Sequence, residues 1–326
     1  MTTQIALRTS LLAACVGAAV LVPAVIAQAA TTTIATEHVP TRVAAWEGTV
    51  MWSHLDPATN RYALMKSVGA GAPVAVAVPQ RSGTPFDVDL GTSRDGATFA
   101  VYTRGGDVYR LNVATGTEAK VRTLSSPDHA ERSPTIQRGR IAFIRRNGRV
   151  DELRIGSASG APKGSRVLVR RTTIGSAELG DRHVAYVASK PYEAGGETQL
   201  RIRSLYTKAD KQVYRARSGG ANIASITRPS YVAAPGAFVF ARTNMGSGGG
   251  NRLVRYTLRS SRLAYDQGSP FFISTAWAGA QLGAVTTSVV AGSESGDSTS
   301  PGACTEVGRN YCTVELTGPL TFGLRP

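Results

Sequence analysis

Asp87 and Asp89 are the two side chains whose types and spacing best suit chemistry. They lie in Phe86–Leu90, a stretch with the alternation of a β-strand, and residues two apart on a strand share one face. Two carboxylates on one face could serve as the acid and base of a glycosidase. They could also supply two oxygen ligands to calcium. This pair is the main argument for an enzyme.

Other catalytic or cofactor-binding patterns are missing from the sequence. No G-x-S-x-G elbow is present, and Met245–Gly250 is glycine-rich but is not followed by the Lys-Ser/Thr of a phosphate-binding loop. We therefore expect no cofactor, no metal and no catalytic activity. The alternative is a carbohydrate-active or metal-dependent enzyme that uses the aspartate pair. The histidines have no metal-ligand spacing; they are His38, His54, His129 and His183.

The N-terminus has the pattern of an export signal. Arg8 supplies a positive charge, Leu11–Ile26 is apolar, and Ala27–Ala29 is a small-x-small cleavage site. We expect residues 1–29 to be removed, so that the mature chain begins at Ala30 and lies outside the cell or in its envelope. The rival hypothesis is a lipoprotein modified at Cys15, because Leu12–Cys15 resembles a lipobox. We expect no transmembrane segment after cleavage.

Removal of the signal would leave two cysteines, Cys304 and Cys312. Exported proteins with an even number of cysteines usually pair them, so we predict a disulfide that closes this short, turn-rich ring. The formal net charge is +15, and only six of the 37 basic residues are lysines. An arginine-rich surface favours anionic polymers. Compositional bias of the genome would produce the same excess.

A unit of strands and turns recurs along the chain. The stretch Ser93–Gly116 contains an Asp-Gly turn, a strand, a Gly-Gly turn and an alternating strand, and its pattern returns about every 42 to 55 residues. Six units of four strands predict an all-β fold, a six-bladed β-propeller of four-stranded antiparallel blades. In such a fold Asp87 and Asp89 could equally line a solvated central channel. The expected blades are 41–79, 86–124, 133–170, 173–217, 228–267 and 271–326, and we expect residues 30–40 to be able to pair with the last blade.

The second unit resembles the blade repeat of the TolB-type six-bladed propellers. The resemblance lies in Ser93–Gly96, Phe99–Tyr102, Asp107–Tyr109 and Ala114–Gly116. It extends from about Thr41 to Pro326, although the full motif occurs only in this unit. The resemblance implies a secreted propeller that docks a partner, and it carries over no catalytic residue.

The connections between the second and third strands of the units predict a binding face. They are short in units two and three but lengthen to Lys190–Thr198, Asn244–Asn251 and about 292–309 in the last three units. Because long loops on a rigid scaffold often bind ligands, we expect a non-catalytic platform for an envelope protein or an anionic envelope polymer, and no specific nucleic-acid site. Drift in tolerant loops would give the same lengths. The predicted face comprises Arg145, Arg146, Arg149, Tyr192, Asn244 and Asn251.

Overall fold

The computed structural model describes twelve segments of the chain. These are residues 30–37, 41–69, 71–160, 164–192, 195–219, 223–226, 228–233, 236–245, 252–265, 271–277, 284–291 and 310–318. Within them, no helix has the length and apolarity needed to cross a bilayer. The predicted signal peptide, Cys15 and Cys304 lie outside these residues, and so does the side chain of Cys312.

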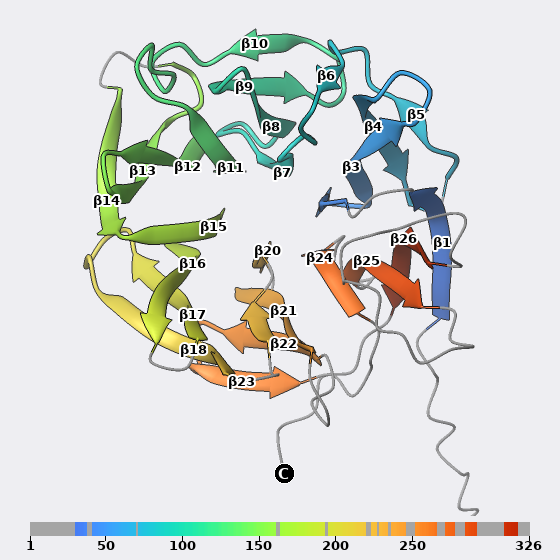
Figure 1. Ribbon diagram of the computed structural model, residues 1–326. Coiled ribbons are helices and arrows are strands. Elements are labelled where there is room, and N and C mark those ends of the chain that lie inside the picture. The colour runs from blue at the N-terminus through green and yellow to red at the C-terminus, as the bar shows by residue number, and fades with distance from the viewer. Residues whose placement is uncertain are drawn as a thin grey trace, which may run out of the picture.

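The described strands pair antiparallel into six sheets arranged around a common centre (Figure 1). The first sheet contains β2 (Val43–Trp46), β3 (Thr49–Asp56), β4 (Arg61–Val68), β5 (Val74–Ala75) and β6 (Arg81–Ser82). The second contains β7 (Asp89–Thr92), β8 (Thr98–Arg104), β9 (Asp107–Asn112) and β10 (Glu118–Lys120). The third contains β11 (Glu131–Gln137), β12 (Arg140–Asn147), β13 (Val150–Ser157) and β14 (Ser165–Arg171).

The remaining sheets follow the same order from the centre outward. The fourth contains β15 (Thr173–Leu179), β16 (His183–Tyr192), β17 (Gly195–Ser204) and β18 (Asp210–Gly219). The fifth contains β19 (Ile223–Ile226), β20 (Ser230–Val232), β21 (Ala237–Met245), β22 (Arg252–Thr257) and β23 (Arg262–Tyr265). The sixth contains β24 (Phe271–Trp277), β25 (Ala284–Ala291), β26 (Asn310–Gly318) and the N-terminal strand β1 (Ala30–Glu37). In the first sheet β5 and β6 both pair with β4, and in the fifth β19 and β20 both pair with β21, so each sheet is four strands wide. The protein is therefore a β-propeller of four-stranded antiparallel blades.

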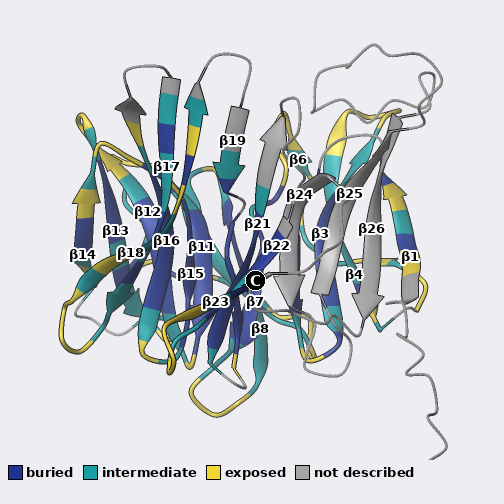
Figure 2. Cartoon of the chain, turned by 90° about the horizontal axis from the view of Figure 1, so that it is seen from below, coloured by how far each residue is buried: buried dark blue, intermediate teal, exposed yellow. Residues whose placement is uncertain are grey.

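Strands one place out from the centre are buried on both faces. In β8, Ala100 and Tyr102 pack toward the first sheet, whereas Val101 packs toward the third. The same alternation occurs in β12 and in β16. Because each sheet is covered by a neighbour on either side, these strands read in the sequence as continuous apolar runs and not as alternating ones. Figure 2 shows burial along the strands and exposure at many of the turns.

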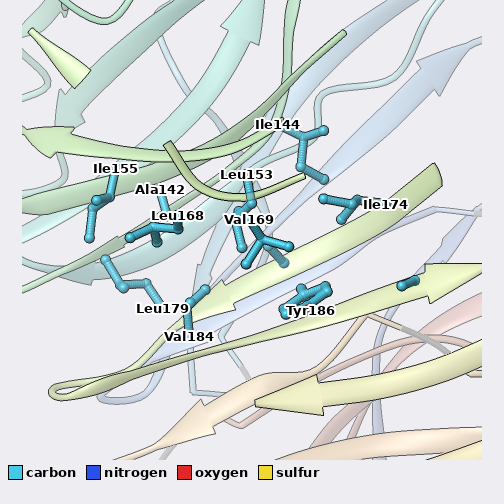
Figure 3. Close-up of a cluster of buried hydrophobic side chains, with 12 residues drawn as sticks. Ala142, Ile144, Leu153, Ile155, Leu168, Val169, Ile174, Leu179, Val184 and Tyr186 are labelled. Atoms are coloured by element: carbon cyan, nitrogen blue, oxygen red, sulfur yellow. The ribbon is translucent and has the colours of Figure 1, made fainter. Parts of the chain in front are cut away.

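The cores lie between neighbouring sheets. Figure 3 shows the cluster in which Ile144 and Leu153 of the third sheet meet Ile174 and Tyr186 of the fourth. Full burial of each such side chain stabilises the fold by about 1.5–3 kcal/mol relative to exposure. Near the centre the approach is closer still: a Cβ on Gly91 of β7 would lie 2.0 Å from the carbonyl oxygen of Ile136 in β11. Only glycine fits between these two inner strands.

Strand β1 joins the two ends of the chain. It pairs antiparallel with β26 from Ala30↔Gly318 to Glu37↔Cys312. The buried carboxylate of Glu37 also accepts a hydrogen bond of 2.6 Å from Nε1 of Trp52 in β3. Its other oxygen lies 2.8 Å from Nδ1 of His54. The N-terminal strand thus bonds to the last sheet and to the first.

The prediction of a loop at Lys190–Thr198 is wrong for both ends of this range, which belong to strands. Strands β16 and β17 stay paired to Tyr192↔Gly195, so the extra length forms a taller hairpin and not an irregular loop. The other two predicted long connections, at 246–251 and 292–309, lie outside the described residues.

Candidate functional site

Both carboxylates of the predicted aspartate pair accept main-chain hydrogen bonds within the fold. Strand β7 begins at Asp89, and the side chain of Asp89 is buried, with Oδ2 accepting a hydrogen bond of 2.9 Å from the amide of Ile136. Asp87 precedes the strand and accepts hydrogen bonds from the amides of Thr103 and Ser133, both 2.8 Å long. These carboxylates join the second sheet to the third. Their oxygens are therefore already used as hydrogen-bond acceptors within the fold.

Asp89 belongs to a buried charged cluster around Arg228, which lies between β19 and β20. The Arg228 guanidinium lies 3.3 Å from Oδ1 of Asp89 and 3.7 Å from Oε2 of Glu178 in β15. It also donates hydrogen bonds to the carbonyls of Val88, at 3.1 Å, and Pro134, at 2.9 Å. One side chain of the fifth sheet therefore contacts the second, third and fourth.

Burial governs the protonation of this cluster. It raises the pKa of Asp89, while the Arg228 charge opposes the rise. The pKa of Glu178 lies well above its usual range, because burial and the charge of Asp89 together outweigh Arg228. Glu178 also accepts a hydrogen bond from the amide of Tyr231, at 3.0 Å, and one from the hydroxyl of Thr135. With its partners supplied from within, the cluster is a junction between sheets and not a ligand site.

Two arginines of the predicted binding face have partners within the third sheet. Arg145 lies opposite Glu131, and its Nε donates a hydrogen bond of 2.8 Å to that buried carboxylate. Arg146 forms an ion pair of 3.3 Å with Asp151 and donates to the carbonyl of Thr172. Both arginines hold the third sheet together. Of the three arginines, Arg149 alone is exposed without an ion pair to a described residue.

The other predicted contact residues are Tyr192, Asn244 and Asn251. The backbones of Tyr192 and Asn244 end β16 and approach the end of β21, but their side chains lie outside the described residues, as does all of Asn251. The disulfide of Cys304 and Cys312 stays a prediction for the same reason. In the described part of the chain, no three His, Cys, Asp or Glu side chains are grouped to hold a metal.

A hollow of about 770 Å³ lies between the second and third sheets, at the end that carries the Asp95–Gly96 turn. Its walls come from the β7–β8 and β11–β12 turns, the ends of β9 and β13, and the start of β14. The lining includes one carboxylate, Asp95, and five arginines: Arg94, Arg110, Arg138, Arg140 and Arg166.

Three of these arginines have no counter-ion. Arg94 and Arg166 are exposed, Arg110 is half-buried, and none forms an ion pair with a described residue. Arg138 and Arg140 are instead bound to Asp181 of the fourth sheet, Arg138 through Nε at 3.1 Å and Arg140 through the main-chain carbonyl. The hydroxyl of Ser93 donates to Asp95 and lowers the pKa of that carboxyl, which keeps it ionised beside Arg94.

A smaller hollow of about 170 Å³ adjoins the first and shares Arg110, Ala158 and Ser159 with it. It adds Lys120 and Arg122. Lys120 is paired with Asp107 at 2.6 Å, whereas Arg122 is exposed and unpaired among the described residues. We call the two hollows together the arginine groove. The sequence favoured the long-loop face for binding and ranked the opposite face, which bears the Asp95–Gly96 turn, second, although arginines flank the turns of both units at this end.

The fold and the arginine groove define the class of protein, a β-propeller with a basic hollow between two blades. Solved structures agree on the fold. The chain is similar to TolB from Acinetobacter baumannii, with a TM-score of 0.56 and 12% identity over 85% of this chain and 67% of that one. It is also similar to a luciferin-regenerating enzyme, with a TM-score of 0.56 and 10% identity over 91% and 97% of the two chains.

Enzymes and a chain from a nidogen–laminin complex both occur among the similar structures. An oligogalacturonate lyase in complex with manganese has a TM-score of 0.50 and 12% identity, over 76% of this chain and 71% of that one. No family model and no curated protein matches the sequence. At these identities the similarity shows the propeller fold alone.

Proposed function

We propose that this protein is an exported, non-catalytic, six-bladed propeller of the TolB type that binds an anionic envelope polymer in the arginine groove. The observation that carries the proposal is the gathering of Arg94, Arg110 and Arg166 around one hollow, where none of them forms an ion pair with a described residue. Six sheets meet through their inner strands, and β1 pairs with β26, which supports a closed ring of six blades. The signal pattern of residues 1–29 supports export.

Arginine suits this role on physical grounds. Its planar fork of donors matches carboxylate and phosphate oxygens, and its charge does not titrate near neutral pH. Like charges gathered in one hollow repel one another, so an anion that enters relieves the repulsion as it binds. A protein that only needed a basic, soluble surface would gain nothing from clustering them.

The absence of catalysis is part of the proposal. The aspartates that could have served as acid and base accept main-chain hydrogen bonds, and Asp89 is buried against Arg228. A general acid or base needs to reach the substrate proton directly or through one water molecule. The oxygens of these carboxylates instead bond to neighbouring sheets, which supports a structural role and not a catalytic one.

A triple variant of the arginine groove tests the proposal. We expect R94Q/R110Q/R166Q to bind long-chain polyphosphate about a hundredfold more weakly than the parent, from about 1 kcal/mol lost per contact. Binding is measured by titration calorimetry at fixed salt. Thermal unfolding should be close to that of the parent, because none of the three side chains forms an ion pair with a described residue. The contact of Arg110 with the Phe99 ring is worth only about 0.5–1 kcal/mol.

The matched control is R61Q/R149Q/R215Q. It removes the same three charges from exposed arginines in the first, third and fourth sheets, outside the arginine groove. We expect its affinity to fall by no more than about twofold, the size of a general charge effect screened by salt. Equal losses in the two variants would show that net charge and not the groove governs binding. A loss confined to the control would favour the face that carries Arg149.

A further inference from the structure

The geometry points to one continuous track for a linear phosphate polymer without aromatic rings, running from Arg94 through Arg110 to Arg122. This inference rests on the proposed function and names its ligand class. The two hollows are joined because both are lined by Arg110, Ala158 and Ser159. A ligand held at Arg110 therefore touches both of them.

The unpaired arginines follow successive strands of the second sheet. Arg94 lies in the turn before β8, Arg110 lies on β9, and Arg122 follows β10 by two residues. Neighbouring strands are about 4.8 Å apart, and the pairing of Lys120 with Tyr109 places Arg122 farther along β9 than Arg110. The two ends of the track are therefore at least roughly 10 Å apart. One phosphate group cannot contact both ends of this span. A chain with an anionic group in each repeating unit can.

The opposite wall adds Arg166 from the start of β14 and a surface of small residues. Gly139, Gly156 and Gly164 line the larger hollow, together with the hydroxyl-bearing Ser157 and Ser159. Small residues leave room for a chain to lie along the wall, and hydroxyls can donate to its oxygens.

The aromatic side chain in the lining is already covered. Phe99 has the Arg110 guanidinium above its ring, 5.7 Å from the centroid. Sugar-binding and base-binding grooves gain affinity by stacking rings on open aromatic faces. Among the described lining residues, the arginine groove offers no such face. This favours a chain that binds through charge and oxygen acceptors, such as polyphosphate or a polyol phosphate, over an acidic polysaccharide or single-stranded nucleic acid.

Chain length and a single substitution test the track. We expect long-chain polyphosphate to bind at least about tenfold more tightly, per phosphate group, than tripolyphosphate or orthophosphate, because only the long chain contacts both hollows at once. R122Q should weaken long-chain binding several-fold, lower the salt slope by about one and leave tripolyphosphate binding unchanged. If R122Q leaves the long chain unaffected, the track is wrong, although the larger hollow could still bind anions.

Ligand competition tests the chemical class. Poly(glycerol phosphate), polyglutamate, polygalacturonate and oligothymidine are added separately to the complex with labelled polyphosphate. Displacement by poly(glycerol phosphate) at matched charge identifies the polyol phosphate as the ligand source, and its failure identifies polyphosphate. Tighter binding of polygalacturonate, polyglutamate or oligothymidine than of both phosphate polymers would overturn the inferred class. If the parent protein binds none of these polymers, the proposed function itself is wrong.

Discussion

Replacing Arg228 with methionine should lower the free energy of unfolding by about 3–5 kcal/mol, the usual effect of removing one partner from a buried ion pair. Methionine keeps much of the side-chain volume but leaves the carboxylate of Asp89 and the carboxyl group of Glu178 without the guanidinium that they contact. It also leaves the carbonyls of Val88 and Pro134 without a donor. Urea unfolding measures the effect, and R215M at an exposed position is the control.

A second substitution separates charge from packing. In R228M, changing Asp89 to asparagine should restore part of the lost stability, because the buried negative charge is removed. In the parent, the same D89N change should destabilise or be neutral. If the free energy of unfolding of R228M lies within about 1 kcal/mol of the parent value, the junction between the inner strands does not contribute the stability predicted for it.

The same cluster predicts how stability depends on pH. The folded-state pKa of Glu178 lies well above its unfolded value, so the folded state keeps a proton that the unfolded state releases. The stability from this proton is fully present below the unfolded pKa of about 4.5 and is lost as the pH rises through the folded pKa. Asp89 shifts in the same direction. We therefore expect the free energy of unfolding to fall as the pH rises from about 4.5.

Glu178→Gln should flatten this dependence, because glutamine does not titrate. The measurement is urea unfolding at a series of pH values, and E47Q at an exposed site is the control. Asp89 and Arg228 face Glu178 directly, so a residual slope from Asp89 is expected. If the parent and E178Q show the same slope above pH 4.5, the buried carboxyl is not protonated in the folded state.

The sheets could be predicted because their signals are local. Gly105 and Gly106 both take left-handed backbone angles, as a tight hairpin turn requires, and this pair is visible in the sequence. Runs such as Phe99–Tyr102 and Ile141–Ile144 form the strands expected of them. Repetition of these signals was sufficient to predict an all-β propeller. The pairing of β1 with β26 joins residues almost 300 positions apart. From the sequence this pairing was predicted only as a possibility for residues 30–40.

The site was harder to predict because it depends on which charges meet. Arg145 stands two residues before a turn and looks exposed in the sequence, but the register places it opposite the buried Glu131. Arg228 was not recognised, although it is the one charged residue between Arg217 and Arg242, which is a signal for a buried charge. The long connections predicted that binding would occur at the end of the sheets that carries them. The arginines that form no ion pair with a described residue line a hollow at the opposite end of the sheets. The connections at that end are short, so loop length did not indicate a site there.

Arginine footprinting tests the central claim most directly. The protein is treated with an arginine-selective dicarbonyl reagent, with and without long-chain polyphosphate, and modification is measured for each peptide by mass spectrometry. The account predicts protection of Arg94, Arg110 and Arg166 by the polymer, with Arg61, Arg149 and Arg215 modified equally in both samples. Protection of Arg149, with Arg94, Arg110 and Arg166 unchanged, would contradict it.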